Sequence, residues 1–190
     1  TTGEGGMATT NNTDLARKMS ELRTHGITKE SERFFTNNPP PWLYEQQSLG
    51  FNYRMSDIQA ALGLSQLRRL DQIVAIRNKK LKDYANLIKS LPCRFLEIDK
   101  DVYSSVHLAI VSFIDIDRKK HREIFENLRV NNIGVQLHYY PVHLQPFFKQ
   151  FGFGIGSFPK SEHYSRSALS IPLFPELEFE EQEYIIKCLE

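Results

Sequence analysis

The chain has 190 residues, enough for one large domain or parts of two, and 41% of them are hydrophobic, as in ordinary globular proteins. Its 24 lysines and arginines nearly balance 23 acidic residues, which argues against a protein dedicated to nucleic acid or a membrane surface. No apolar run is long enough to cross a bilayer. Cys93 and Cys188 lack a metal-site spacing, so we expect free thiols in a cytoplasmic protein rather than a disulfide.

The first residues, Thr1-Thr2-Gly3-Glu4-Gly5-Gly6-Met7, contain neither an initiator methionine nor a signal peptide. Glycine-rich turn residues followed at once by an apparent strand over residues 7–10 are typical of the interior of a chain. We therefore expect a longer protein that begins upstream. The glycine cluster resembles a phosphate-binding loop only superficially, because no Lys-Ser or Lys-Thr pair follows it, and a tight strand connection is the better interpretation.

A helix is predicted after Asn12 or Thr13, either of which can cap it, and Gly26 is a natural residue just beyond its end. Residues 28–48 are polar and contain three consecutive prolines, Pro39 to Pro41. A connection of this length is unusual in a compact domain. We expect a loop that is either functional or mobile.

Residues 50–63 place a short polar loop directly before a long helix. Ser56 can cap that helix, and Gln59, three residues later, completes a capping box. Asn52 and Arg54 lie two apart in extended backbone, so their side chains can face the same way. An amide and a guanidinium held at a helix N-terminus suit a phosphate or a carboxylate.

The helical pattern continues almost to Ser90, which would make a helix of about 50 Å. We expect either a break near Leu70-Asp71 or a helix that bridges two domains. Strands are predicted over residues 106–114 and 133–138, and helices over residues 118–130, 161–169 and 177–189. A strand–helix–strand order predicts a small α/β layer.

A second group of polar residues follows the second of these predicted strands. His138, Tyr139, Tyr140 and His143 enter a loop whose course Pro141 restricts. Loops at strand ends often carry binding groups, so we expect either ligand contacts or packing. The spacing of the two histidines fits no helix face and no further ligand is near, so we predict no metal site.

Five blocks of sequence stand out when taken together. They are residues 1–7, Leu22-Arg23-Thr24-His25-Gly26, residues 50–63, residues 133–143, and Leu169-Ser170-Ile171-Pro172-Leu173-Phe174-Pro175. In this order, and over essentially the whole chain, they resemble the DegT/DnrJ/EryC1/StrS family of pyridoxal-phosphate sugar aminotransferases. Within the family, the resemblance is nearest to enzymes that aminate C4 of a UDP-4-keto-6-deoxy-aminosugar in pseudaminic acid biosynthesis.

The resemblance implies the α/β fold of aspartate aminotransferase, of which this chain would be the C-terminal half. Residues 1–70, including the long loop 28–55, would end the large cofactor domain, and residues 71–190 would form the small domain. In the family, the lysine that binds pyridoxal 5'-phosphate lies just before the block matched by residues 1–7. We therefore expect no catalytic residue in this chain.

The resemblance also assigns roles to individual residues. Asn52 matches the asparagine that reaches into the neighbouring subunit and binds the cofactor phosphate, although an asparagine can also satisfy its own turn. Arg54 would assist that phosphate or the diphosphate of the sugar nucleotide, and the alternative is an ion pair with Asp57 or another local carboxylate. The substrate sugar would be contacted by His138, Tyr139, Tyr140 and His143.

The function implied is transfer of an amino group from glutamate to a nucleotide-linked 4-keto-6-deoxy sugar, for a surface polysaccharide or glycan. The enzyme would be a homodimer whose active sites are shared between subunits. Two alternatives stay open: a sugar 3-dehydratase of the same family, in which histidine replaces the lysine, and a regulatory homologue without catalysis. The sugar, the position aminated and the stereochemistry are not determined by these residues.

Overall fold

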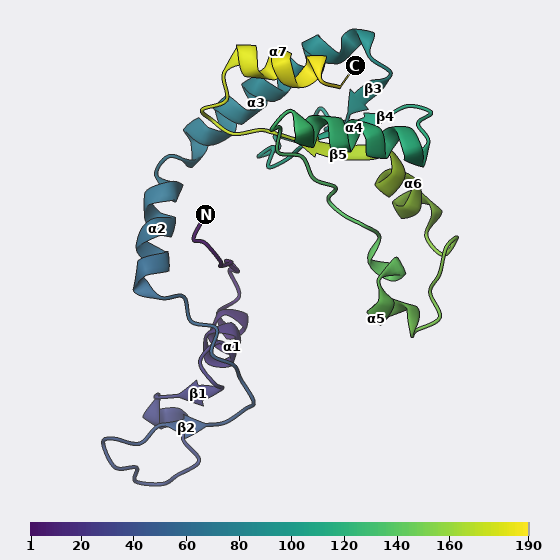
Figure 1. Cartoon of the computed structure of the whole chain (residues 1–190). Helices are drawn as coiled ribbons and strands as arrows, with labels where there is room; N and C mark the ends of the chain where they lie inside the picture. The colour runs from purple at the N-terminus through teal and green to yellow at the C-terminus, as the bar shows by residue number, and fades with distance from the viewer. Residues whose placement is uncertain (190) are drawn as a thin grey trace. The chain divides into compact units, whose positions relative to one another are not determined.

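The computed structural model describes residues 1–189. Contacts divide the chain into two compact units, Thr1–Arg69 and Leu70–Glu190, and each is described by itself (Figure 1). The predicted break in the long helical segment is confirmed, since α2 (Asp57–Leu67) ends before α3 (Leu70–Leu87) begins. The assignment of the two units to a cofactor domain and a small domain stays a prediction.

The first unit contains three helical and two strand elements. They are α1 (Thr13–Leu22), β1 (Ile27–Thr28), η1 (Ser31–Arg33), β2 (Glu45–Gln46) and α2 (Asp57–Leu67). The Asn12 side chain caps α1 as predicted, accepting a hydrogen bond from the Leu15 N–H at 2.9 Å. The predicted strand over residues 7–10 is wrong, because this segment pairs with no strand in residues 1–189.

The two ends of the segment predicted as a loop over residues 28–48 are hydrogen-bonded to each other. β1 and β2 form a two-stranded antiparallel ribbon, and η1, a short 3-10 helix, lies between them along the chain. The carboxylate of Glu45 accepts hydrogen bonds from the backbone N–H groups of Phe35 and Thr36 at 2.8 and 2.9 Å. The ribbon and this carboxylate therefore fix where the loop leaves and re-enters the unit.

The second unit alternates helices with short strands. Its elements are α3 (Leu70–Leu87), η2 (Ile88–Ser90), β3 (Cys93–Phe95), β4 (Ala109–Phe113), α4 (Arg118–Val130), η3 (Val142–Leu144), α5 (Pro146–Lys149), α6 (Pro159–Ser167), β5 (Ala168–Ile171) and α7 (Phe179–Lys187). The helix predicted over residues 118–130 is confirmed with the same bounds. Those predicted over 161–169 and 177–189 are confirmed with shifted or shorter bounds.

The three strands of this unit form an antiparallel sheet in the order β3-β4-β5, with β4 in the centre. The strand predicted over residues 133–138 is wrong, because only Gln136 pairs, in a single bridge to Ser170. Ile133 and Val135 are buried, so the alternation that prompted the prediction exists without a hydrogen-bond ladder. The third strand is β5 instead, whose first two residues fall within the helix predicted over residues 161–169.

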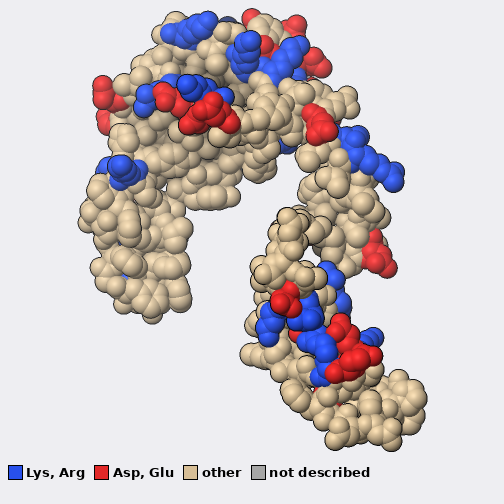
Figure 2. Space-filling view, turned by 180° about the vertical axis from the view of Figure 1, so that it is seen from behind, with Lys and Arg blue, Asp and Glu red and all other residues tan. Residues whose placement is uncertain are grey.

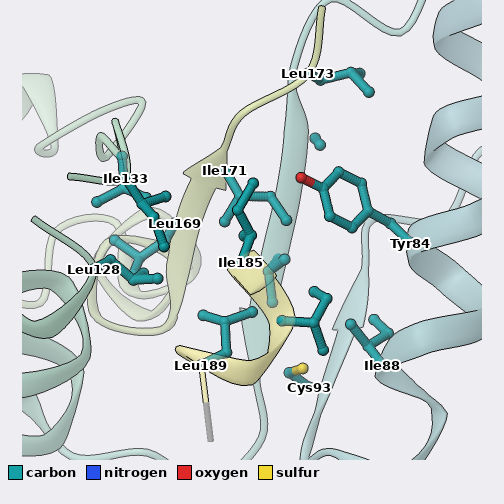
Figure 3. Close-up of a cluster of buried hydrophobic side chains, with 14 of the residues drawn as sticks. Tyr84, Ile88, Cys93, Leu128, Ile133, Leu169, Ile171, Leu173, Ile185 and Leu189 are labelled. Atoms are coloured by element: carbon teal, nitrogen blue, oxygen red, sulfur yellow. The ribbon is translucent and has the colours of Figure 1, made fainter. Parts of the chain in front are cut away.

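The core of the second unit lies between this sheet and its helices (Figure 3). Val111, Leu128 and Leu169 are at most 1% exposed. Tyr84 is fully buried too, and its hydroxyl donates a hydrogen bond to the Pro172 carbonyl at 3.0 Å. Burial raises the pKa of Tyr84 well above its usual range, so this hydroxyl stays a donor. Gln182 joins α7 to α3 by donating to the Lys80 carbonyl at 2.9 Å.

Both cysteines are free thiols, as predicted. Cys93 is buried, which raises the pKa of its thiol and leaves it poorly reactive. In residues 1–189, no helix is long and apolar enough to cross a membrane. The same residues hold no group of three histidine, cysteine or acidic side chains placed to bind a metal ion.

Candidate functional site

Residues 50–55, here called the Asn52 loop, are fastened to the end of α1 by backbone hydrogen bonds. The N–H of Phe51 donates to the Leu22 carbonyl, and the N–H of Tyr53 donates to the Arg23 carbonyl, each at 2.8 Å. The carbonyl of Phe51 accepts from the His25 N–H at 2.9 Å. The loop is thus held extended by the fold itself, which reduces the conformational entropy lost when a ligand binds.

Two glycines allow the Asn52 loop to lie so close to α1. A side chain at Gly50 would collide with backbone atoms of Gly26 and Leu22, and one at Gly26 would collide with the backbone of Ser48. Gly26 also has a φ of 71°, in the left-handed region that glycine adopts without strain. The glycines of these two sequence blocks therefore have a packing role that positions the loop.

The side chains of Asn52 and Arg54 are exposed, and within residues 1–189 neither has a hydrogen bond or an ion pair. The rings of Phe51 and Tyr53 stack with centroids 5.2 Å apart, which leaves Asn52 and Arg54 on the other face of the extended loop. The alternative ion pair between Arg54 and Asp57 does not form. Free amide and guanidinium donors fit the phosphate that the resemblance assigns to them, and that role stays a prediction.

The start of α2 is rigid for the reason predicted. Ser56 Oγ accepts from the Gln59 N–H at 3.4 Å, and the Ser56 N–H donates to Gln59 Oε1 at 3.1 Å, completing the capping box. The Gln59 amide also donates to the Glu4 carbonyl at 2.9 Å. The glycine-rich segment at residues 3–6 is therefore attached to α2 by a hydrogen bond rather than placed between two strands.

The structure separates the four residues of the second predicted group. His138 is half-buried, with its Nδ1 2.8 Å from Ser170 Oγ and its carbonyl accepting from the Tyr164 hydroxyl at 3.0 Å. Tyr139 and Tyr140 are 71% and 51% exposed. The Tyr139 ring stands edge-on to the His138 ring at 4.8 Å. Of the four, the two tyrosines are the most accessible to a substrate.

His143 is instead buried and bonded within the protein. Its Nε2 lies 3.1 Å from Glu162 Oε1, which also accepts the N–H groups of Gly156 and Phe158 at 2.8 and 3.3 Å. Burial alone raises the pKa of Glu162, but the hydrogen bonds from His143 and the two N–H groups outweigh it and lower that pKa overall. The ionised carboxylate can only accept, so His143 Nε2 is the donor. Substrate contact by His143 stays a prediction that this burial does not favour.

Residues 144–158, here called the aromatic arm, follow directly. Phe147 contacts Phe148 and Phe151, with ring centroids 5.2 and 5.7 Å apart, and Phe153 contacts Phe158 at 5.7 Å. The chain has no acidic residue between Glu126 and Glu162, and the space-filling view shows a surface around α5 that is almost free of red (Figure 2). The arm is therefore apolar, cationic where charged, and without a carboxylate of its own.

Neither the lysines nor the cavities of the described residues indicate a second candidate site. Lys80 is the one lysine in residues 1–189 that is not exposed, and its ammonium donates to the Leu177 carbonyl. None is held in a desolvated pocket of the kind that an amine nucleophile needs. A cavity of about 350 Å³ beside Cys93 and an open groove of about 630 Å³ along α1 contain none of the predicted site residues.

Comparisons with known proteins give the family. Residues 1–190 match the DegT/DnrJ/EryC1/StrS aminotransferase family. The spore coat polysaccharide biosynthesis protein SpsC of Bacillus subtilis is 34% identical over 195 residues, covering 99% of this chain and 49% of that protein. The UDP-4-amino-4,6-dideoxy-N-acetyl-beta-L-altrosamine transaminase of Campylobacter jejuni is 30% identical over 186 residues, covering 97% and 47%. The chain spans about half the length of the curated relatives it matches.

Solved structures agree. The apo form of Spr1654 from Streptococcus pneumoniae, described as a putative sugar aminotransferase, superposes with a TM-score of 0.86 at 27% identity, over 100% of this chain and 47% of that one. The PMP form of the same protein also matches, at 25% identity and a TM-score of 0.85, in keeping with a family that uses pyridoxal phosphate. The mixed α/β fold thus corresponds to about half of a fold-type I sugar aminotransferase. The chain belongs to the DegT/DnrJ/EryC1/StrS aminotransferase family.

Proposed function

We propose that these residues form the C-terminal half of a pyridoxal-phosphate-dependent enzyme that transfers an amino group from glutamate to a nucleotide-linked 4-keto-6-deoxy sugar. The observation that carries the proposal is the Asn52 loop, whose backbone is hydrogen-bonded to the end of α1. The loop exposes two side chains, Asn52 and Arg54, that can donate hydrogen bonds to a phosphate. The names of the B. subtilis and C. jejuni relatives support a sugar-nucleotide substrate and a polysaccharide or glycan product.

Pyridoxal phosphate, when bound, supplies the electron sink for moving a proton at the substrate carbon. Asn52 and Arg54 would hold its phosphate, because amide and guanidinium N–H groups bind phosphate oxygens well. The residues of this chain contribute binding and orientation. The lysine that forms the covalent bond to the cofactor would come from a part of the enzyme outside residues 1–190.

The same proposal extends to the partners of this chain. Tyr139 and Tyr140, with His138 beside them, would contact the sugar. Asn52 would serve the active site of a neighbouring subunit in a homodimer, as the family resemblance implies, and its exposed side chain is in keeping with this role. Glutamate would be the amino donor, and the enzyme would act in the cytoplasm.

The proposal is tested on the full-length protein with glutamate and UDP-4-keto-6-deoxy-N-acetylhexosamines. Formation of 2-oxoglutarate together with an amino sugar, identified by mass spectrometry, is the expected result. A product that has lost a hydroxyl without gaining nitrogen would instead identify a dehydratase. No uptake of pyridoxal phosphate at all would identify a regulatory homologue.

Replacing Asn52 by alanine should weaken cofactor retention. A hydrogen bond to a charged phosphate contributes about 1.5–3 kcal/mol, so the dissociation constant of pyridoxal phosphate should rise about tenfold to hundredfold. Equilibrium dialysis of the full-length protein measures it. The matched control is Asn37→Ala, at an exposed asparagine of the same unit. Equal retention by both variants would sink the assignment of Asn52.

A further inference from the structure

Glu162 is a buried acid whose carboxylate has hydrogen-bond partners that come before its helix begins. It is 5% exposed, and one of its oxygens, Oε1, faces His143 and the N–H groups of Gly156 and Phe158. A buried carboxylate is tolerated when such donors surround it. Because α6 starts only at Pro159, these bonds do not hold the helix together but tie it to the segment in front.

The same stretch of chain also holds the other end of that segment. The Tyr164 hydroxyl donates to the His138 carbonyl at 3.0 Å, and Ser170 Oγ lies 2.8 Å from His138 Nδ1. Both ends of the segment 138–158 are therefore hydrogen-bonded to the same stretch of chain, which comprises α6 and β5. Tyr164 holds the start of this segment at His138, and Glu162 holds its end at Gly156 and Phe158.

No other carboxylate competes for this task. Between Glu126 and Glu162 the sequence has no acidic residue, while Lys149 and Lys160 are exposed. The backbone donors at Gly156 and Phe158 meet a charged acceptor in Glu162 alone, and such bonds are roughly twice as strong as bonds between neutral groups. Among the contacts that hold the segment, the charged anchor is thus the carboxylate of Glu162, at its C-terminal end.

We propose that Glu162 is the positioning residue of the predicted sugar-binding loop, and that it acts through His143 and the backbone of the aromatic arm to fix where His138, Tyr139 and Tyr140 lie. His143 is then the buried partner of Glu162 and not a ligand of the sugar. The identity of the ligand rests on the proposed function, whereas the hydrogen bonds do not. Glu162 itself would touch neither cofactor nor substrate.

The first test measures the anchor directly. Glu162→Gln keeps the shape of the side chain and removes its charge, so the amides of Gly156 and Phe158 should exchange with solvent about tenfold faster in the full-length protein. Glu180→Gln, at an exposed glutamate of α7, is the matched control and should change nothing there. Unchanged exchange in Glu162→Gln would overturn the inference.

The second test measures the consequence for the substrate. In Glu162→Gln, the KM for the keto sugar should rise about tenfold, while kcat/KM for glutamate in the other half-reaction stays as in the wild type. Tyr164→Phe removes one hydroxyl at the surface of α6 and should shift the same constant in the same direction. His143→Gln, which changes a direct partner of Glu162, keeps the inference testable should Glu162→Gln fold poorly, as a lowered urea midpoint would show.

A double-mutant cycle separates the two roles of His143. If His143 acts only through Glu162, the effects of Glu162→Gln and His143→Gln on the sugar KM should not add. Additive effects would mean that His143 contacts the sugar independently, against the inference. A wild-type enzyme that aminates no keto sugar would sink the proposed function, whereas an active wild type whose Glu162→Gln variant keeps its sugar KM would sink this inference alone.

Discussion

Two glutamates stabilise loops as capping residues stabilise helix ends, because the carboxylate of each accepts hydrogen bonds from two backbone N–H groups. Glu45 accepts from Phe35 and Thr36 in the first unit, and Glu162 accepts from Gly156 and Phe158 in the second. Partial burial by itself raises the pKa of Glu45, but the hydrogen bonds from Phe35, Thr36 and Gln47 outweigh it and lower that pKa to about 2.

This low pKa predicts how the long loop responds to acid. A carboxyl whose pKa falls from 4.5 to about 2 on folding stabilises the loop fully above about pH 4.5, and the contribution is lost as the pH falls toward 2. In an NMR titration, the amide shifts of Phe35 and Thr36 should therefore change with a midpoint near pH 2. Glu45→Gln should abolish that transition, and Glu32→Gln, at an exposed glutamate, should leave it in place.

A midpoint in the ordinary range of glutamate, near pH 4.3, would show that Glu45 does not hold the loop. The same holds if Glu45→Gln leaves the Phe35 and Thr36 amide shifts titrating as before.

Whether such a residue can be found from sequence depends on how far away its partners lie. Asn12, Ser56 and Gln59 act within three residues of themselves, so their spacing alone predicts the caps. Glu162 binds His143, nineteen positions earlier, and in the sequence it resembles any acid on the first turns of a helix. Its signal is faint: it is the first acidic residue after a long stretch without one.

At the scale of elements, local spacing predicted the helices and the central strand β4, which lies within the predicted residues 106–114, but not the other strands. A helix satisfies its hydrogen bonds internally, whereas a strand needs a neighbour whose position no local pattern contains. Residues 133–138 alternate correctly but find a single bridge, while β5, with all four residues buried, shows no alternation and pairs with β4. The three-residue strand β3 is too short for any pattern to reveal.

The contact between the Asn52 loop and α1 gives a prediction at this scale. Gly50→Ala places a methyl group against backbone atoms of Gly26 and Leu22, and backbone cannot rotate away as a side chain can. Overpacking of this kind typically costs about 1–3 kcal/mol. The free energy of opening measured by hydrogen exchange at the Phe51 and Tyr53 amides should fall by about that amount.

The matched control is Gly6→Ala in the same unit, because an added methyl group at Gly6 meets no atom within 4 Å. This variant should leave exchange at Phe51 and Tyr53 unchanged. Equal effects of the two substitutions would show that the close approach of the loop to α1 does not hold it in place.

Across the whole chain, the apolar core is distributed unevenly between the two units. Every member of the buried hydrophobic cluster lies between Tyr84 and Leu189, in the second unit. In the first, neither α1 nor α2 buries a residue, and Ile58 and Leu67 are 83% and 63% exposed. Its order comes from backbone hydrogen bonds, caps and glycine contacts, each of which contributes little net free energy.

The two units should therefore differ in whether they fold alone. Fixing the backbone costs about 1–2 kcal/mol per residue, and burial of apolar surface is the main term that offsets it. Expressed separately, residues 70–190 should unfold cooperatively in urea, and residues 1–69 should show no cooperative transition by circular dichroism. Leu128→Ala should lower the free energy of unfolding of residues 70–190 by about 2–5 kcal/mol, because Leu128 has no exposed surface. A cooperative transition in residues 1–69, or none in residues 70–190, would contradict the expectation that core burial decides which unit is self-sufficient.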